Sequence, residues 1–184
     1  MTVKVRFVCA EIVGDARQGD YQLPEEATVA MRKMAPQASN ASWALRFAAS
    51  LEGLVTVLSG MSTPEQLADN IRTMKDFRPL TEAERAALDE TVAYLRSVPT
   101  IPCTSCRYCV KGCPQQIGIP GVFSCVNTYK VYRNLNGARS SYGFVPRNGG
   151  KASDCIACGQ CEAVCPQSIH IIDELKEAAA LLDQ

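Results

Sequence analysis

The sequence predicts a mostly helical α+β chain with two parts, residues 1–98 and 99–184. Three observations predict this class. Amphipathic helical patterns recur in the first part, only one or two short apolar runs there have the length of strands, and the second part contains two similar runs of cysteine. Pro99 and Pro102 end the last helical pattern of the first part, so we place the boundary near residues 98–102.

A helix and a strand are predicted in close succession in the first part. In residues 41–52, Trp43, Phe47 and Leu51 recur every four positions, which places them on one face of an amphipathic helix. The apolar run at residues 54–59 is short, and it predicts a buried strand.

Two further helices of the first part begin with capping boxes. Thr63, followed by Pro64 and Gln66, is expected to cap one helix. Thr81, followed by Glu84, is expected to cap the next. The side chains expected on the inner faces of these two helices are Leu67, Ile71 and Met74 on the first, and Leu88, Val92 and Leu95 on the second.

The second part contains two more expected helices. One runs from Pro120 to about Leu135, and the other is a terminal helix that we expect Asp173 to cap. Between them lie a stretch rich in Gly, Asn and Ser, residues 136–150, and the second cysteine run.

Charged residues balance in number, with 19 Lys and Arg against 19 Asp and Glu, but they are unevenly distributed. No Asp or Glu occurs from Thr91 to Ser153, where the basic residues are scattered, so we expect no binding to nucleic acid. The N-terminus is charged and no later run approaches the roughly 20 apolar residues that span a membrane. We therefore expect a cytoplasmic protein with no membrane segment.

Eight of the ten cysteines form two runs with identical spacing. Each run is Cys-x2-Cys-x2-Cys-x3-Cys-Pro, the pattern of bacterial ferredoxins that bind two 4Fe-4S clusters. Three thiolates two residues apart surround three corners of a cubane, whereas the fourth lies past the loop and reaches the other cluster. The pattern predicts one cluster on Cys103, Cys106, Cys109 and Cys165, and the other on Cys155, Cys158, Cys161 and Cys113.

Zinc and uncommitted cysteines are the alternatives for these runs. Zinc on paired Cys-x2-Cys elements needs only four tetrahedral ligands and gives no role to a third equally spaced cysteine. Cys9 and Cys125 match neither run, and we expect both to be small buried hydrophobes. We expect His170, the single histidine, to have a structural role rather than to be a ligand.

Two stretches together resemble a known family. Residues 43–71 resemble the end of the aldo-keto reductase barrel, its seventh strand and the cofactor loop that follows. The region from Cys103 to Leu175 resembles the dicluster ferredoxin tail of bacterial aldo-keto reductases that carry iron and sulfur. The resemblance spans roughly residues 41–183. It implies an incomplete barrel segment, residues 1–98, followed by a helix-rich dicluster 4Fe-4S ferredoxin-type domain, residues 99–184.

A nucleotide site is also implied by the resemblance. In that family, the segment after the seventh strand holds the adenosine phosphate of NADP, and backbone amides at a helix start favour an anion. The basic residues that many relatives use for the 2'-phosphate are replaced here by Gly60 and Gln66. The matching positions are Gly60, Met61, Ser62, Thr63, Gln66 and Asn70.

No catalytic residue is expected in this chain, because the regions that carry the family's catalytic Asp, Tyr, Lys and His have no counterpart. A barrel needs eight strands, and at most two are indicated, at residues 54–59 and 5–13. We therefore expect the C-terminal portion or a subunit of an oxidoreductase. The apolar face of Trp43, Phe47 and Leu51 predicts self-association or pairing with the missing barrel part.

Three functions fit these patterns, and we favour the first. It is an iron–sulfur electron-transfer protein that passes single electrons between a carrier and a partner active site. The second is an NAD(P)H-dependent oxidoreductase of aldo-keto reductase type, and the third is a purely structural role for the clusters. The basic stretch either offsets the negative charge of the clusters, which we favour, or docks a ferredoxin, a flavodoxin or a reductase subunit.

Overall fold

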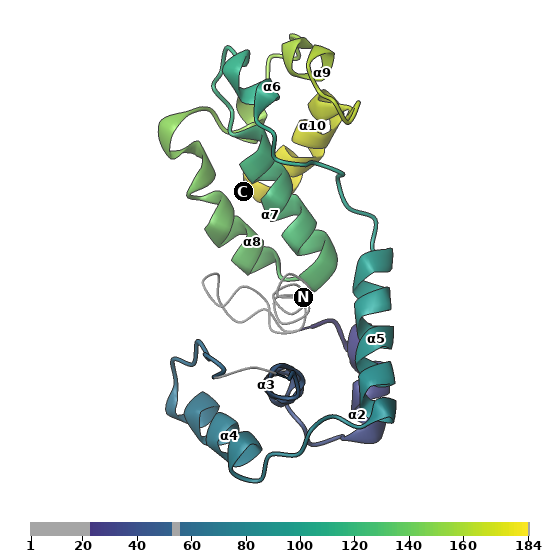
Figure 1. Ribbon diagram of the computed structural model, residues 1–184. Coiled ribbons are helices and arrows are strands. Elements are labelled where there is room, and N and C mark those ends of the chain that lie inside the picture. The colour runs from purple at the N-terminus through teal and green to yellow at the C-terminus, as the bar shows by residue number, and fades with distance from the viewer. Residues whose placement is uncertain (1–22, 53–55, 184) are drawn as a thin grey trace. The chain divides into compact units, whose positions relative to one another are not determined.

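The computed structural model describes residues 23–52 and 56–183, and the chain divides into two compact units between Val98 and Pro99 (Figure 1). Both units are helical, and the described residues contain no β-strand. The prediction of a mostly helical chain is confirmed. Within the described ranges, no helix combines the length and the apolar character needed to cross a membrane.

The first unit is a set of short helices around a small core. The helix predicted around Trp43 is confirmed, since residues Asn40–Ala49 are helical. Trp43 and Met31 are almost completely buried in the core, whereas Phe47 and Leu51 are half-buried. α2 packs against α5, and α3 packs against α4. The helices of this unit's described residues are η1 (Glu25–Thr28), α2 (Val29–Met34), α3 (Asn40–Ala49), α4 (Pro64–Lys75) and α5 (Glu82–Ser97).

Both predicted capping boxes are present. The amide of Gln66 donates to the hydroxyl of Thr63 over 3.3 Å, and the amide of Glu84 donates to that of Thr81 over 3.2 Å. In return, Gln66 and Glu84 accept from the amides of the two threonines. The inner face predicted for α5 is buried, and it consists of Leu88, Val92 and Leu95.

Glu84 also joins α5 to α3. Both guanidinium NH2 groups of Arg46 donate to its carboxylate, over 2.7 and 2.9 Å, and both side chains are mostly buried. The hydrogen bond from Arg46 lowers the pKa of Glu84 below its usual value of 4.5. The Arg46 guanidinium lies 5.9 Å from the ring centroid of Trp43, so this ion pair borders the core.

We expect the Glu84→Gln variant to lose about 1–2 kcal/mol of unfolding free energy at pH 7, because the charged hydrogen bonds from Arg46 are lost. A lowered folded-state pKa stabilises the fold only while the carboxyl is ionised. This contribution is complete above the usual value of 4.5 and is lost as the pH falls through the lowered value. Urea denaturation followed by the fluorescence of Trp43, the single tryptophan, measures it. Equal stability of variant and wild type at pH 7 would contradict the prediction, and Glu82→Gln on the same helix is the control.

Two predictions for the first unit are wrong. The strand expected at residues 54–59 is absent from its described part, residues 56–59, where Leu58 is 92% exposed. A parallel strand needs neighbours for its backbone hydrogen bonds, and the described residues offer none. The face of α4 that was predicted to be buried is also exposed, and it consists of Leu67, Ile71 and Met74. α4 contacts α3 through another side. The second candidate strand, at residues 5–13, lies outside the described residues.

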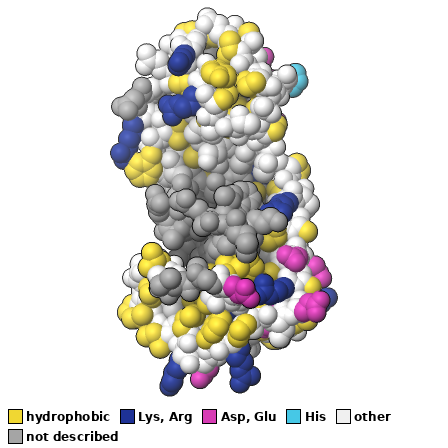
Figure 2. All heavy atoms as spheres, viewed as in Figure 1, with side chains coloured by type: hydrophobic (Ala, Val, Ile, Leu, Met, Phe, Trp, Pro, Cys, Tyr) yellow, Lys and Arg dark blue, Asp and Glu magenta, His cyan; other side chains and the backbone are white. Residues whose placement is uncertain are grey.

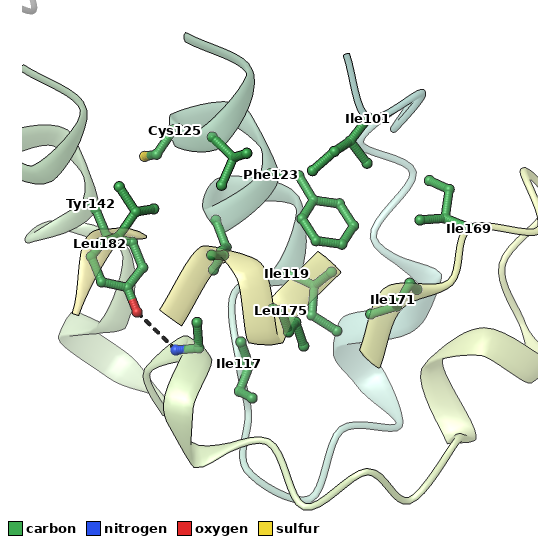
Figure 3. Packing of buried hydrophobic residues seen from close by; sticks show 14 of the residues in the cluster. Ile101, Ile117, Ile119, Phe123, Cys125, Tyr142, Ile169, Ile171, Leu175 and Leu182 are labelled. Atoms are coloured by element: carbon green, nitrogen blue, oxygen red, sulfur yellow. Dashed lines mark hydrogen bonds between the residues drawn. The ribbon is translucent and has the colours of Figure 1, made fainter. Parts of the chain in front are cut away.

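The second unit has a core formed by α7, α8 and α10 (Figure 3). Phe123 and Ile119 of α7 meet Ile171 and Leu175 of α10, and each of these side chains is 1% exposed. The helix predicted from Pro120 to about Leu135 is confirmed, but it ends at Tyr132, and Leu135 begins the next helix. The helices of this unit's described residues are α6 (Tyr108–Lys111), α7 (Ile119–Tyr132), α8 (Leu135–Tyr142), η2 (Val145–Asn148), η3 (Ala152–Asp154), α9 (Gln160–Ala163) and α10 (Ile171–Leu182).

The start of α10 differs from its prediction. The helix begins at Ile171, so Asp173 lies within the first turn and is not the cap. The carboxylate of Glu162, on α9, instead accepts from the amide of Ile172 over 2.9 Å. A side chain from the second cysteine run therefore satisfies one of the free N–H groups at this helix start.

Tyr142, at the end of α8, is tied to the segment that leads into the second cysteine run. Its hydroxyl accepts from the amide of Ala152 over 2.8 Å, and both residues are buried (Figure 3). Burial raises the pKa of Tyr142 well above its usual value, so the phenol stays protonated. This hydrogen bond fixes the backbone three residues before Cys155.

We expect Tyr142→Phe to destabilise the second unit by about 1–3 kcal/mol, since it leaves the buried amide of Ala152 without an acceptor. Thermal unfolding followed by circular dichroism measures the loss. Tyr94→Phe, at a partly exposed tyrosine of the first unit, is the matched control and should change little. An unchanged melting temperature for Tyr142→Phe would show that the amide finds another partner.

Candidate metal centres

The two cysteine runs adopt the same backbone conformation. Each cysteine of the second run follows its counterpart by 52 residues, as Cys103 and Cys155 do, and the same offset relates α6 to α9 and the first residue of α7 to that of α10. The amide of Gln116 donates to the carbonyl oxygen of Cys113 over 3.0 Å, and the amide 52 residues later donates to that of Cys165 over 3.1 Å. The internal repeat is therefore structural as well as sequential.

Left-handed residues recur at the same offset. Alternation of left-handed and ordinary residues turns successive backbone N–H groups to one side, and such concavities bind anions and iron–sulfur groups. All but one of the residues involved carry a side chain, for which a left-handed backbone costs roughly 1–2 kcal/mol. The pairs are Ser105 and Ala157 (φ 57° and 55°), Arg107 and Gly159 (65° and 76°), and Gln116 and Ser168 (52° and 51°).

A first cavity in the described part of this unit is bordered by thiols from both runs. It encloses about 320 Å³ of empty space, open solvent included. Ile119, Phe123 and Ile171 form its apolar wall, and Arg107 also lines it. Its cysteines are Cys103, Cys106, Cys109 and Cys165.

The second cavity repeats the first. It also encloses about 320 Å³, open solvent included, and its apolar wall includes Ile117, Ile119 and Leu175. No Lys, Arg, Asp or Glu side chain lines it. Its cysteines are Cys113, Cys155, Cys158 and Cys161.

Close packing of two segments brings Cys113 to the second cavity. The amide of Gly150 donates to the carbonyl oxygen of Gln115 over 2.9 Å, just after Cys113 in the chain. A Cβ atom on Gly150 would lie 2.7 Å from that oxygen, so this approach requires glycine. The chain that enters the second run therefore lies directly against the end of the first.

The thiols in each set share a graded burial. Cys109 and Cys161 are buried, Cys106 and Cys158 are exposed, and the other four are intermediate. Burial raises the pKa of the Cys109 thiol to about 11, and burial also raises that of Cys161. A metal must displace protons from these thiols at neutral pH, so metal binding is favoured as the pH rises.

The donor set fits two 4Fe-4S clusters. Four thiols border each cavity, three from one run and one from the other, together with an apolar wall, and left-handed residues recur in both runs. In the described part of the chain, no group of three or more His, Cys, Asp or Glu side chains is set to hold a single metal ion. The cysteines that the sequence assigns to each cluster are those that the fold brings together.

The remaining cysteines and the histidine lie elsewhere. Cys125, on α7, is buried in the core and lines neither cavity, and burial raises its pKa to about 11. The prediction that it is a small buried hydrophobe is confirmed. His170 is exposed just before α10 and also lines neither cavity. Cys9 lies outside the described residues.

The predicted nucleotide loop is occupied by its own side chains. The Oε1 atom of Gln66 accepts from the amides of Ser62, over 2.7 Å, and of Thr63, over 3.3 Å. The side-chain Nδ2 of Asn70 donates to the hydroxyl of Ser59 and to the sulfur of Met61. A phosphate would have to displace Gln66 to reach these amides, so NADP binding at this exposed loop, which includes Gly60, stays a prediction.

The cavities have walls that the cysteine motif does not include. Ile119 lines both cavities, and Gln115 and Gln167 occupy equivalent places in the two. The sequence carries the signal for them, because the 52-residue offset continues beyond the cysteines through Ile117 and Ile169. Extending the comparison of the two runs by six residues would identify these wall residues.

Comparisons with known proteins agree with the two-part organisation. Residues 102–170 match the family model described as a 4Fe-4S dicluster domain, and residues 13–93 match that of the aldo/keto reductase family. The predicted resemblance is confirmed, and on the reductase side it begins at residue 13, earlier than the predicted start near residue 41. No curated protein and no solved structure matches the chain.

Proposed function

Because the chain joins a segment of the aldo/keto reductase family to a 4Fe-4S dicluster domain, we propose that it binds two 4Fe-4S clusters and transfers single electrons as part of an oxidoreductase. One observation carries the proposal. Each of two similar cavities is bordered by four cysteines, and in each case the fourth comes from the other run. This exchange is the ligand arrangement of two-cluster ferredoxins.

The residues of the second unit suit this role. Each site has one buried cysteine in the core, Cys109 in the first and Cys161 in the second. Each also has one exposed cysteine at the surface, Cys106 in the first and Cys158 in the second. A bound 4Fe-4S cluster accepts or releases one electron without making or breaking bonds to substrate. Isoleucine side chains line the inner side of both sites, and the exposed Cys106 and Cys158 leave an edge of each site accessible to a partner protein.

Anaerobic purification and visible spectroscopy test the proposal. We expect a brown protein whose broad absorption bleaches with dithionite and gives a paramagnetic signal in the reduced state. A colourless protein that contains zinc after anaerobic purification would overturn the proposal. Retention of clusters that no reductant or oxidant changes would instead favour a purely structural role.

A redox partner is part of the proposal. Between Thr91 and Ser153 the chain has no acidic residue, Arg107 lines the first cavity, and Arg107, Tyr108 and Lys111 are exposed. Basic side chains around an exposed redox site favour an acidic partner such as a ferredoxin, a flavodoxin or a reductase subunit.

Self-association or pairing with further barrel elements is also proposed, but Trp43 is buried and takes no part. The exposed apolar side chains of the described first unit include Leu58, Leu67 and Ile71.

We expect NADPH added to the cluster-loaded protein to leave the visible spectrum unchanged. Gln66 occupies the amides that a phosphate would use, and the chain has no counterpart of the catalytic tetrad. Dithionite added afterwards is the control and should bleach the same sample. Bleaching by NADPH alone would contradict this expectation and would favour the NAD(P)H-dependent reductase.

A further inference from the structure

The two cysteine-lined cavities share one backbone frame, so any difference in their electrostatics arises from side chains that break the repeat. The wall positions of the first cavity include Thr104 and Arg107. Their counterparts 52 residues later are Ile156, which lines the second cavity, and Gly159. The first cavity is therefore lined by a threonine and an arginine, whereas their counterparts in the second repeat are an isoleucine and a glycine.

Arg107 occupies a position where glycine is the favourable residue. Its φ is 65°, in the left-handed region, and Gly159 has a φ of 76° at the equivalent place. A non-glycine residue held in a left-handed conformation beside a site is a starting point for a hypothesis of function. Of the three left-handed pairs, this is the one that has a glycine in one repeat and a charged residue at the equivalent position of the other.

The charged residues between the third and fourth cysteines also differ between the two repeats. The first repeat carries exposed Lys111 on α6, and its counterpart on α9 is Ala163. α9 instead carries Glu162, whose counterpart on α6 is Val110. On the face of this unit seen in Figure 2, Lys and Arg side chains are exposed and acidic ones are visible only at the edge. Between its third and fourth cysteines, the first repeat thus carries a basic residue and the second an acidic one.

We propose, on the basis of the two clusters of the proposed function, that the site of Cys103, Cys106, Cys109 and Cys165 has the higher reduction potential and that Arg107 sets the difference. Reduction adds one negative charge to a site, and a nearby cation stabilises that charge. An electron delivered by an external one-electron donor therefore comes to rest at the first site. The second site, without Arg107, is the harder to reduce.

A redox titration followed by electron paramagnetic resonance tests the proposal on the wild type and four variants of the full chain. Arg107→Gly gives the first site the backbone residue of the second, and it relieves a strained position. Gly159→Arg makes the reciprocal change, and a Cβ there meets no atom within 4 Å. Arg107→Lys keeps the charge, and Lys176→Gln removes an exposed charge that lines neither cavity.

In the wild type we expect two distinct midpoints. Arg107→Gly should shift the higher midpoint to lower potential and so reduce the difference between the two midpoints. Arg107→Lys should retain most of that difference. Gly159→Arg should raise the lower midpoint, and Lys176→Gln should leave both nearly unchanged. If the Gly159→Arg variant does not bind its clusters, the comparison of Arg107→Gly with Arg107→Lys still tests the proposal.

Failure of this inference differs from failure of the proposed function. A protein that contains about eight irons per chain, but whose midpoints do not respond to Arg107→Gly, would overturn the inference and leave electron transfer intact. A shift of the lower midpoint by Arg107→Gly would also overturn it. A protein without iron–sulfur clusters would instead remove the proposed function.

Discussion

Replacing Cys113 with alanine should remove the cluster held by the second run and leave the one held by the first. Cys113 follows the first run in sequence, but it lines the second cavity together with Cys155, Cys158 and Cys161. The iron content should fall from about eight to about four atoms per chain, since a 4Fe-4S cluster in these proteins needs four thiolates. Iron and sulfide analysis of anaerobically purified variants measures the loss.

Double variants make the assignment of Cys113 decisive. Cys113→Ala with Cys155→Ala should lose no more iron than Cys113→Ala alone, because both ligands belong to one site. Cys113→Ala with Cys103→Ala should lose nearly all of it. The opposite pattern would contradict the crossed arrangement. Cys125→Ala, at a buried cysteine outside both cavities, is the control and should retain about eight irons.

Removal of the clusters should destabilise the second unit strongly while sparing the first. The eight cysteines border two spaces next to the core, and Cys109 and Cys161 are part of that core. A ligand present at a thousand times its Kd stabilises a fold by about 4 kcal/mol, so cluster loss should lower the melting temperature on the order of 20 °C. Calorimetry before and after treatment with an iron chelator measures the change.

Trp43 fluorescence provides the internal control for that experiment. The described residues of the first unit contain no cysteine, and Trp43 is buried among them. Its unfolding midpoint should therefore be the same with and without clusters. An unchanged melting temperature of the second unit after iron removal would mean that the clusters add nothing to its stability.

The grouping of the cysteines around the two cavities was predictable from sequence, because the spacing of the motif determines which cysteines lie together. The spacing of the runs assigns Cys165 to the first group and Cys113 to the second, and the two cavities have these members. The capping boxes at Thr63 and Thr81 were predictable for a similar reason, since a cap depends only on residues three positions apart. Local rules of this kind do not depend on what surrounds the segment.

Features that depend on distant partners were not predictable in the same way. The run at residues 54–59 has the composition of a strand, but its described part pairs with no neighbouring strand. The apolar stripe of α4 has the spacing of a buried face, yet Ile71 is 56% exposed. The composition of residues 136–150 does not indicate α8, which is stabilised by the cap at Asn134 and by packing of Ala138 against the core.

The mass of the intact protein under native, anaerobic conditions tests the central claim most directly. We predict that native mass spectrometry will give the 19.9 kDa polypeptide plus two Fe4S4 units, and that acidification will return the mass to that of the polypeptide alone. A native mass equal to the bare chain, or to the chain with zinc, would contradict the account of two electron-transfer clusters.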